Sequence, residues 1–186
     1  GLWMDWMAQG SRITGNLLYD NDAEDLFMEV NHGPYVVDNN LFLSGHTLRD
    51  WSQGGAYINN LFNGKITHRT IQDRKTPYHK SHSTMIAGFE EIIGGDNRFY
   101  NNIVTTDGLN LYDEDELPMH VNGNVYLNGA QSYFAEETML KKEDFDPQIS
   151  IFTKGADLYL RIYYDSSLRD LSNSVITTEQ LGKASI

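Results

Sequence analysis

The 186-residue sequence contains no cysteine, which excludes a disulfide framework and thiolate chemistry. It also lacks a run of about 18 apolar residues, the length that a membrane-spanning helix needs. Basic residues are scarce, since 14 lysines and arginines stand against 26 acidic residues and the formal net charge is −12. This charge argues against a nucleic-acid partner and against binding to an anionic membrane, and it fits a neutral or cationic ligand.

Several common catalytic and cofactor motifs are absent as well. The sequence has no HExxH, no GxSxG and no glycine-rich phosphate loop, so nothing in it predicts a cofactor. His79 and His82 lie close together, but no third ligand is in register with them, and we predict no metal site. The acidic run Asp113–Glu116 lacks the spaced oxygen ligands and bend glycine of a calcium loop, so we interpret it as a solvated bend.

What the chain does contain is a repeat. An apolar residue followed three positions later by asparagine recurs with spacings of 24, 20, 42 and 22 residues, at Asn16, Asn40, Asn60, Asn102 and Asn124. Coils of this length, with short alternating strands and no helical pattern, are typical of a solenoid. We therefore predict an all-β fold, a right-handed parallel β-helix, in which the five asparagines stack as an internal ladder. The spacing of 42 corresponds to two periods or to one coil with an insertion.

Two acidic residues occupy one position of this repeat. Asp5 precedes Asn16 by eleven residues, and Glu29 precedes Asn40 by eleven. Neighbouring coils lie about 4.7–4.9 Å apart, so equivalent side chains should be roughly 5 Å apart. Retaining glycosidases place their carboxyl groups about 5–5.5 Å apart, whereas inverting ones need about 6.5–9.5 Å. The spacing therefore favours a double displacement, and mutual repulsion would leave one of the two carboxyl groups protonated as an acid.

Counting eleven residues back from the later asparagines extends this column. The count gives Arg49, Glu91 and Asp113, of which Arg49 would be a charge partner for Glu29. The plain alternative is that the two carboxylates are outward polar residues on a solvated face.

Aromatic and basic residues gather near the carboxylates. Trp3, Trp6, Phe27 and Trp51 surround the pair in the predicted register, and aromatic faces are a common platform for sugar rings. Residues 64–84 break the period and carry five of the fourteen basic residues and three of the six histidines. We predict that this insertion folds over the carboxylates and brings His79, Lys80 or His82 near a sugar, the alternative being a surface loop with no further role.

We divide the chain into two parts on this basis. Residues 1–130 form the coils that carry the catalytic pair, with the inserted loop at 64–84. Residues 131–186 form a terminal coil, a hairpin and a C-terminal extension. The hairpin strands are expected at 148–153 and 157–164, acting as a cap on the stack, and the last 20 residues are expected to run extended along the surface.

Several stretches resemble glycoside hydrolase family 120, the β-xylosidases with a right-handed parallel β-helix. They are GLWMDWMAQGSRITGNLLYDN, DLFMEVNHGPYVVDNNLFLS, DWSQGGAYINNLF, HKSHST and the tail VITTEQLGKASI. The family is retaining, and by this resemblance Asp5 is similar to its nucleophile and Glu29 to its acid/base. Its members are much longer, so the resemblance implies an upstream segment that completes the helix.

The function we predict is therefore that of an exo-acting retaining β-xylosidase. Its substrate would be short β-1,4-xylo-oligosaccharides, from which it releases xylose. The predicted substrate-binding residues are Trp6, His32, Trp51, His79 and His82. Three alternatives stay open: an α-L-arabinofuranosidase or α-L-fucosidase on the same fold, a non-catalytic solenoid that binds polysaccharide, and a calcium-dependent lyase.

Overall fold

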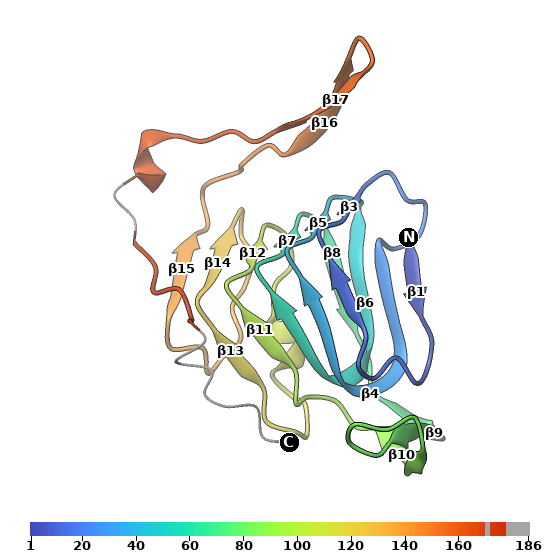
Figure 1. Ribbon diagram of the computed structural model, residues 1–186. Helices are drawn as coiled ribbons and strands as arrows, with labels where there is room; N and C mark the ends of the chain where they lie inside the picture. Colours follow the sequence, from blue (N-terminus) through green and yellow to red (C-terminus); the bar gives the residue numbers. More distant parts are fainter. Residues whose placement is uncertain (170–171, 178–186) are drawn as a thin grey trace.

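The computed structural model describes residues 1–169 and 172–177, and it is a parallel β-solenoid of about six turns (Figure 1). The first of its two long sheets has the order β1-β4-β6-β11-β13, with β2 paired to β4 and β8 paired to β6. Its strands are β1 (Leu2–Met4), β2 (Arg12–Thr14), β4 (Leu26–Asp38), β6 (His46–Ile58), β8 (Lys65–His68), β11 (Arg98–Tyr100) and β13 (His120–Asn122). The predicted fold class, an all-β parallel β-helix, is confirmed.

The second sheet consists of short strands in the order β15-β14-β12-β7-β5-β3. These are β3 (Leu17–Leu18), β5 (Leu41–Phe42), β7 (Leu61–Phe62), β12 (Ile103–Val104), β14 (Asn124–Leu127) and β15 (Met139–Lys142). The described residues also form two 3-10 turns, η1 (Asn110–Tyr112) and η2 (Ser166–Leu168). No helix within the described ranges is long and apolar enough to cross a membrane.

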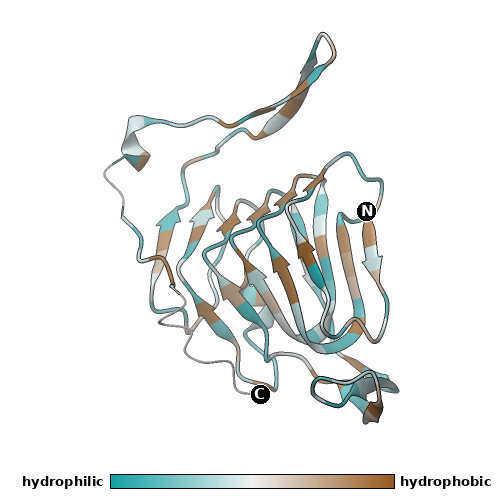
Figure 2. Ribbon diagram, in the orientation of Figure 1, coloured by the Kyte–Doolittle hydropathy of each residue, from teal (hydrophilic) through white to brown (hydrophobic). Residues whose placement is uncertain are grey.

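The core lies between the two sheets and is built from columns of like residues. One column in register is fully or almost fully buried in each coil: Ile13, Val37, Tyr57, Phe99 and Val121. The rings of Tyr57 and Phe99 stack with centroids 4.5 Å apart. Period-2 alternation sends these side chains inward and their neighbours outward, which Figure 2 shows as apolar bands along the strands.

The asparagine ladder is present as predicted. The side-chain oxygen of each later asparagine accepts hydrogen bonds from the backbone and side-chain nitrogens of the asparagine one coil earlier, at 2.9–3.1 Å. The residue just before each ladder asparagine has a positive φ of 55–75°. These residues are Gly15, Asn39, Asn59, Asn101 and Gly123, the two residue types that tolerate the left-handed region best, which explains the repeated Gly-Asn and Asn-Asn pairs.

A carboxylate ends the ladder. Glu136 is 4% exposed, and its Oε1 accepts from the backbone and side-chain nitrogens of Asn124 at 3.0 and 2.9 Å. Its Oε2 accepts from the Tyr126 hydroxyl at 2.5 Å. Burial raises the pKa of Glu136, partly offset by these donors. The repeat did not predict this ladder end, because a glutamate breaks the asparagine pattern.

The fourth coil is split by an arm. β8 pairs with the first half of β6, β11 pairs with its second half, and the antiparallel pair β9 (Ile71–His79) and β10 (Ile86–Ile92) lies between them. The spacing of 42 is therefore one coil with an insertion. The predicted bounds of 64–84 are wrong, because Lys65–His68 is a coil strand whose Ile66 is buried in the core.

The predicted hairpin is formed by β16 (Ser150–Lys154) and β17 (Asp157–Arg161). It projects away from the coils, on the side of the stack where β3, β5 and β7 lie (Figure 1). Its residues and those around Asn21 and Ser44 line a hollow. The hairpin therefore does not cap the open end at β15, as was expected from the sequence. The terminal coil expected after residue 130 is represented by β15, which pairs with β14. Further along the chain, the backbone N–H of Ile176 donates to the Asn101 side chain, and its carbonyl accepts from the same side chain. The tail that was expected to be extended begins within η2, so it is a 3-10 turn at 167–168, and its residues 170–171 and 178–186 lie outside the described ranges.

A buried polar cluster joins the third coil to the acidic run. Asp50 is fully buried and accepts from the Tyr112 hydroxyl at 2.8 Å and the Asn97 amide at 3.2 Å. The two ring nitrogens of His68 lie 3.0 Å from the Asp50 carbonyl oxygen and 2.7 Å from Asp115 Oδ1. Asp115 is thus a buried partner of a histidine, and the interpretation of residues 113–116 as a solvated bend is wrong at this position.

Candidate active site

Two neighbouring parallel strands position the predicted catalytic carboxylates. The register of β1 and β4 places Trp3 beside Phe27 and Met4 beside Met28. Asp5 directly follows Met4, and Glu29 directly follows Met28, so the two acidic residues come after paired positions of adjacent strands. Adjacent parallel strands lie about 4.8 Å apart, the general spacing on which the expected separation of roughly 5 Å rests.

Glu29 is held at both oxygens. The indole nitrogen of Trp3 donates to Oε2 at 2.9 Å, and the guanidinium of Arg74, on β9, donates to Oε1 at 2.9 Å. The Glu29 side chain is 16% exposed, whereas that of Arg74 is 51% exposed. Asp5 is exposed, and its Oδ1 accepts from the backbone N–H of Trp6 at 2.8 Å, which orients the carboxylate locally.

The column beyond Glu29 differs from the prediction. Trp51 is in register with Glu29, whereas Arg49 is in register with Phe27. The constant count of eleven fails because β4 carries two more residues than β6 in this stretch, accommodated by irregularities on either side of His32. Arg49 instead pairs with Glu24 at 2.9 Å, so it is not the charge partner of Glu29.

The remaining two members of the predicted column also lie elsewhere. Glu91 is on β10 of the arm, and Asp113 follows η1. Neither belongs to the strands that carry the carboxylates.

Aromatic rings line the strands beside the carboxylates. Trp3 stacks on Phe27 with centroids 6.1 Å apart, and Phe27 meets the edge of Trp51 at 5.0 Å. Arg69 lies over the Trp51 ring at 5.3 Å from its centroid. Trp6 is 53% exposed, next to Asp5 in the sequence. The predicted concentration of aromatic side chains around the pair is therefore present in the fold.

His32 fastens the arm to the coil. It is buried, its Nε2 lies 3.1 Å from the Thr76 hydroxyl, and its Nδ1 lies 3.4 Å from the Gln53 amide. Thr76 in turn donates to the Val30 carbonyl at 3.0 Å. Burial lowers the pKa of His32, so the ring is neutral near pH 7. The structure thus places this predicted substrate-binding residue behind the surface.

The other two predicted histidines line a hollow of about 750 Å³ between the arm and the first two coils. His79 and His82 lie on one side of it, and Gln9 and Gly33 on the other. Gln9 bridges the two sides, because its amide donates to the Gly33 carbonyl at 2.7 Å and its oxygen accepts from the backbone N–H of His79.

This hollow adjoins the carboxylate strands. Gln9 and Gly33 each follow a carboxylate, Asp5 or Glu29, by four residues. The insertion therefore does approach this side of the helix. The His79 Nε2 atom is buried and finds no hydrogen-bond partner in the described part of the chain.

Arg74 is the contact that sequence reasoning missed. On β9 the residues Gln72, Arg74 and Thr76 share one face by period 2, and Arg74 and Thr76 both bond to the carboxylate strand β4. If residues 71–79 are treated as a strand instead of a loop, this alternation can be predicted from the sequence. Residues 1–169 and 172–177 hold no cluster of three or more His, Asp or Glu side chains placed to bind a metal ion.

This arrangement of coils is shared with a solved structure. XylC, solved in complex with xylose, has a similar fold, with a TM-score of 0.78 and 40% sequence identity over 86% of this chain. The chain is therefore similar, over most of its own length, to part of a xylosidase of glycoside hydrolase family 120. It spans about 30% of the length of XylC. No family model and no curated protein matches the sequence.

Proposed function

We propose that this chain carries the catalytic pair of a retaining xylosidase that releases xylose from the non-reducing end of β-1,4-xylo-oligosaccharides. The observation that supports the proposal is the register of β1 and β4, in which Leu2–Met4 pair with Leu26–Met28, so that Asp5 and Glu29 directly follow paired positions of neighbouring strands. The similarity to XylC supports a glycosidase of xylosidase type. The hollow lined by His79 and His82 is the place that we assign to the sugar beside the carboxylate strands.

The first step forms a bond between Asp5 and the sugar. An Asp5 oxygen attacks the anomeric carbon while the glycosidic bond breaks, and Glu29 gives its proton to the departing oxygen. In the second step Glu29 takes a proton from water, whose oxygen attacks the anomeric carbon and releases the Asp5 carboxylate. The orientation of Asp5 by the Trp6 N–H suits the nucleophile, and the longer Glu29 side chain suits the leaving-group side.

Substrate contacts follow from the same arrangement. Trp6 and Trp51 offer aromatic surfaces near the carboxylates, and His79 and His82 offer ring nitrogens in the hollow. His32 acts from behind by fixing the arm, which presents those rings. A further coil of the same enzyme would pair with the outer edge of β1, because β1 is an edge strand of its sheet and the Asn16 side chain, at the first position of the ladder, only donates among the described contacts.

A panel of nitrophenyl glycosides tests the substrate. We expect turnover of the β-xyloside with net retention of configuration. Faster turnover of an α-L-arabinofuranoside or α-L-fucoside would replace the proposed sugar, and binding of xylo-oligosaccharides with no turnover would identify a non-catalytic solenoid.

Variants of the two carboxylates test their roles. Glu29→Ala should keep glycosylation by an activated nitrophenyl xyloside and should regain turnover with azide as the β-xylosyl azide. Asp5→Ala should lose both steps, and azide should yield only an inverted product. The reverse pattern would exchange the two roles.

A further inference from the structure

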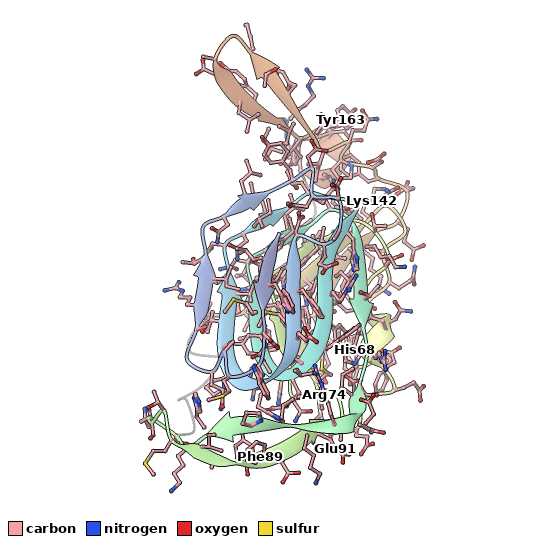
Figure 3. The ribbon with its side chains drawn as sticks, turned by 90° about the vertical axis from the view of Figure 1, so that its right-hand side faces the viewer. His68, Arg74, Phe89, Glu91, Lys142 and Tyr163 are labelled. Atoms are coloured by element: carbon pink, nitrogen blue, oxygen red, sulfur yellow. The ribbon has the colours of Figure 1, made fainter. Side chains whose placement is uncertain are left out.

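The insertion reaches Glu29 through an arginine. Arg74 lies on the side of the arm that faces the solenoid strands (Figure 3). It comes from a different coil than Trp3, so two separate elements converge on one carboxylate. Such a clamp fixes both the position and the rotation of the carboxyl group.

Both hydrogen-bond partners of the Glu29 carboxylate, the Trp3 indole N–H and the Arg74 guanidinium, can donate but cannot accept. An ionised carboxylate accepts at both oxygens and satisfies the guanidinium and the indole N–H together. A protonated carboxyl group would present an O–H to one of them, which has nothing to accept it with. The clamp therefore suits the form of Glu29 that takes a proton from water. Because half of the Arg74 side chain is exposed, it has room to swing into solvent when Glu29 carries a proton.

We propose that Arg74 is a positioning residue for Glu29, which together with Trp3 holds the carboxylate ready to act as base in the second step. This role rests on the proposed function. It assigns to the arm a part in the hydrolysis of the xylosyl–Asp5 intermediate, in addition to its part in lining the hollow.

Arg69 provides a matched control. It lies at the base of the same arm and carries the same charge, but its guanidinium lies over Trp51. Replacing either arginine by methionine removes one positive charge from the same face. Only Arg74→Met removes a hydrogen bond to Glu29.

The first measurement does not depend on activity. The chain has three tryptophans, so the indole N–H region of a ¹⁵N–¹H spectrum holds three signals, of which Trp3→Phe identifies one. Arg74→Met should move the Trp3 signal toward its position in Glu29→Gln, because Glu29 is then held from one side only. Arg69→Met should move the Trp51 signal and leave that of Trp3 in place. An unmoved Trp3 signal in Arg74→Met would refute the clamp.

The second measurement separates the two chemical steps. With a dinitrophenyl β-xyloside the first step needs little acid assistance, so Arg74→Met should keep a fast burst and lower the steady-state rate on the order of tenfold. Arg74→Lys should recover part of the loss, since it returns the charge without the planar fork. An equal loss in Arg69→Met would reduce the effect to charge alone and overturn the positioning role. If the unmodified protein turns over no glycoside, the proposed function fails and the catalytic part of this proposal fails with it, whereas the spectrum still decides whether the clamp exists.

Discussion

Replacing an asparagine inside the ladder should destabilise the solenoid far more than replacing the one at its edge. The Asn60 side chain is 1% exposed and makes four hydrogen bonds. Its oxygen accepts two from Asn40, and its nitrogen donates to the Val37 carbonyl and to Asn102. In Asn60→Ala, two donors of Asn40 and the Val37 carbonyl lose their partners inside the protein.

The size of the effect follows from those orphaned groups. Each buried group left without a partner costs about 1–3 kcal/mol, so Asn60→Ala should lower the free energy of unfolding by about 3–5 kcal/mol after some relaxation. For a domain of this size, that is a drop in Tm of roughly 6–20 °C. Among the described contacts the Asn16 side chain only donates, to Asn40 and to the Thr14 carbonyl, so Asn16→Ala should cost about 1 kcal/mol.

Urea denaturation followed by tryptophan fluorescence and far-UV circular dichroism measures both variants. Asn60→Asp serves as a control of equal volume: it keeps an acceptor for Asn40 but loses both donated bonds, and it should fall near Asn60→Ala. Equal losses for Asn16→Ala and Asn60→Ala would refute the ladder as a main source of stability.

Two further predictions concern the core and the coil contacts. Burial raises the pKa of Asp50 to about 6 from an ordinary value of 3.8, so the folded protein keeps this proton after the unfolded chain has lost it. The free energy of unfolding should therefore fall by up to about 3 kcal/mol as the pH rises from about 4 to about 6, and denaturant titrations of Asp50→Asn should lack this fall. Gly33→Ala would place a Cβ 1.8 Å from the Gly54 carbonyl oxygen, so it should lower Tm by several degrees and change the shape of the hollow that Gly33 lines. The control is Gly10→Ala, which has open space around its Cβ but a φ of +80° and should cost only about 1 kcal/mol of unfolding free energy. Equal thermal shifts in the two variants would contradict the close coil contact.

The coil architecture and the ladder could be predicted because both depend on a short repeat. The five asparagines from Asn16 to Asn124 mark successive turns, and the residue before each one has a positive φ that favours glycine or asparagine. The requirement is therefore visible in adjacent residues of the sequence. The equivalence of Asp5 and Glu29 followed from the same count, and the two residues directly follow the paired positions Met4 and Met28.

Features that depend on distant contacts could not be read in this way. Counting failed at Arg49 because two extra residues in β4 shift the register, and no local signal announces such a shift. The basic residues at 65–69 resemble a loop in composition, although Ile66 already alternates into the core. Asp115 is buried against His68, a residue 47 positions away in the sequence. The acidic neighbours of Asp115 are typical of an exposed bend, so nothing local predicts this contact.

The split of the fourth coil has a consequence for how the chain closes its turns during folding. Neighbouring ladder positions are usually 20–24 residues apart, and the arm lengthens one of these intervals to 42. Closure entropy grows only with the logarithm of the loop, so this near doubling costs about 0.6 kcal/mol. An excursion of this kind leaves the registers on both sides unchanged, because each half of the interrupted coil pairs with β6 independently. An insertion in the middle of a coil beside the carboxylates therefore costs little free energy. The inserted residues can add contacts there without disturbing the coils on either side.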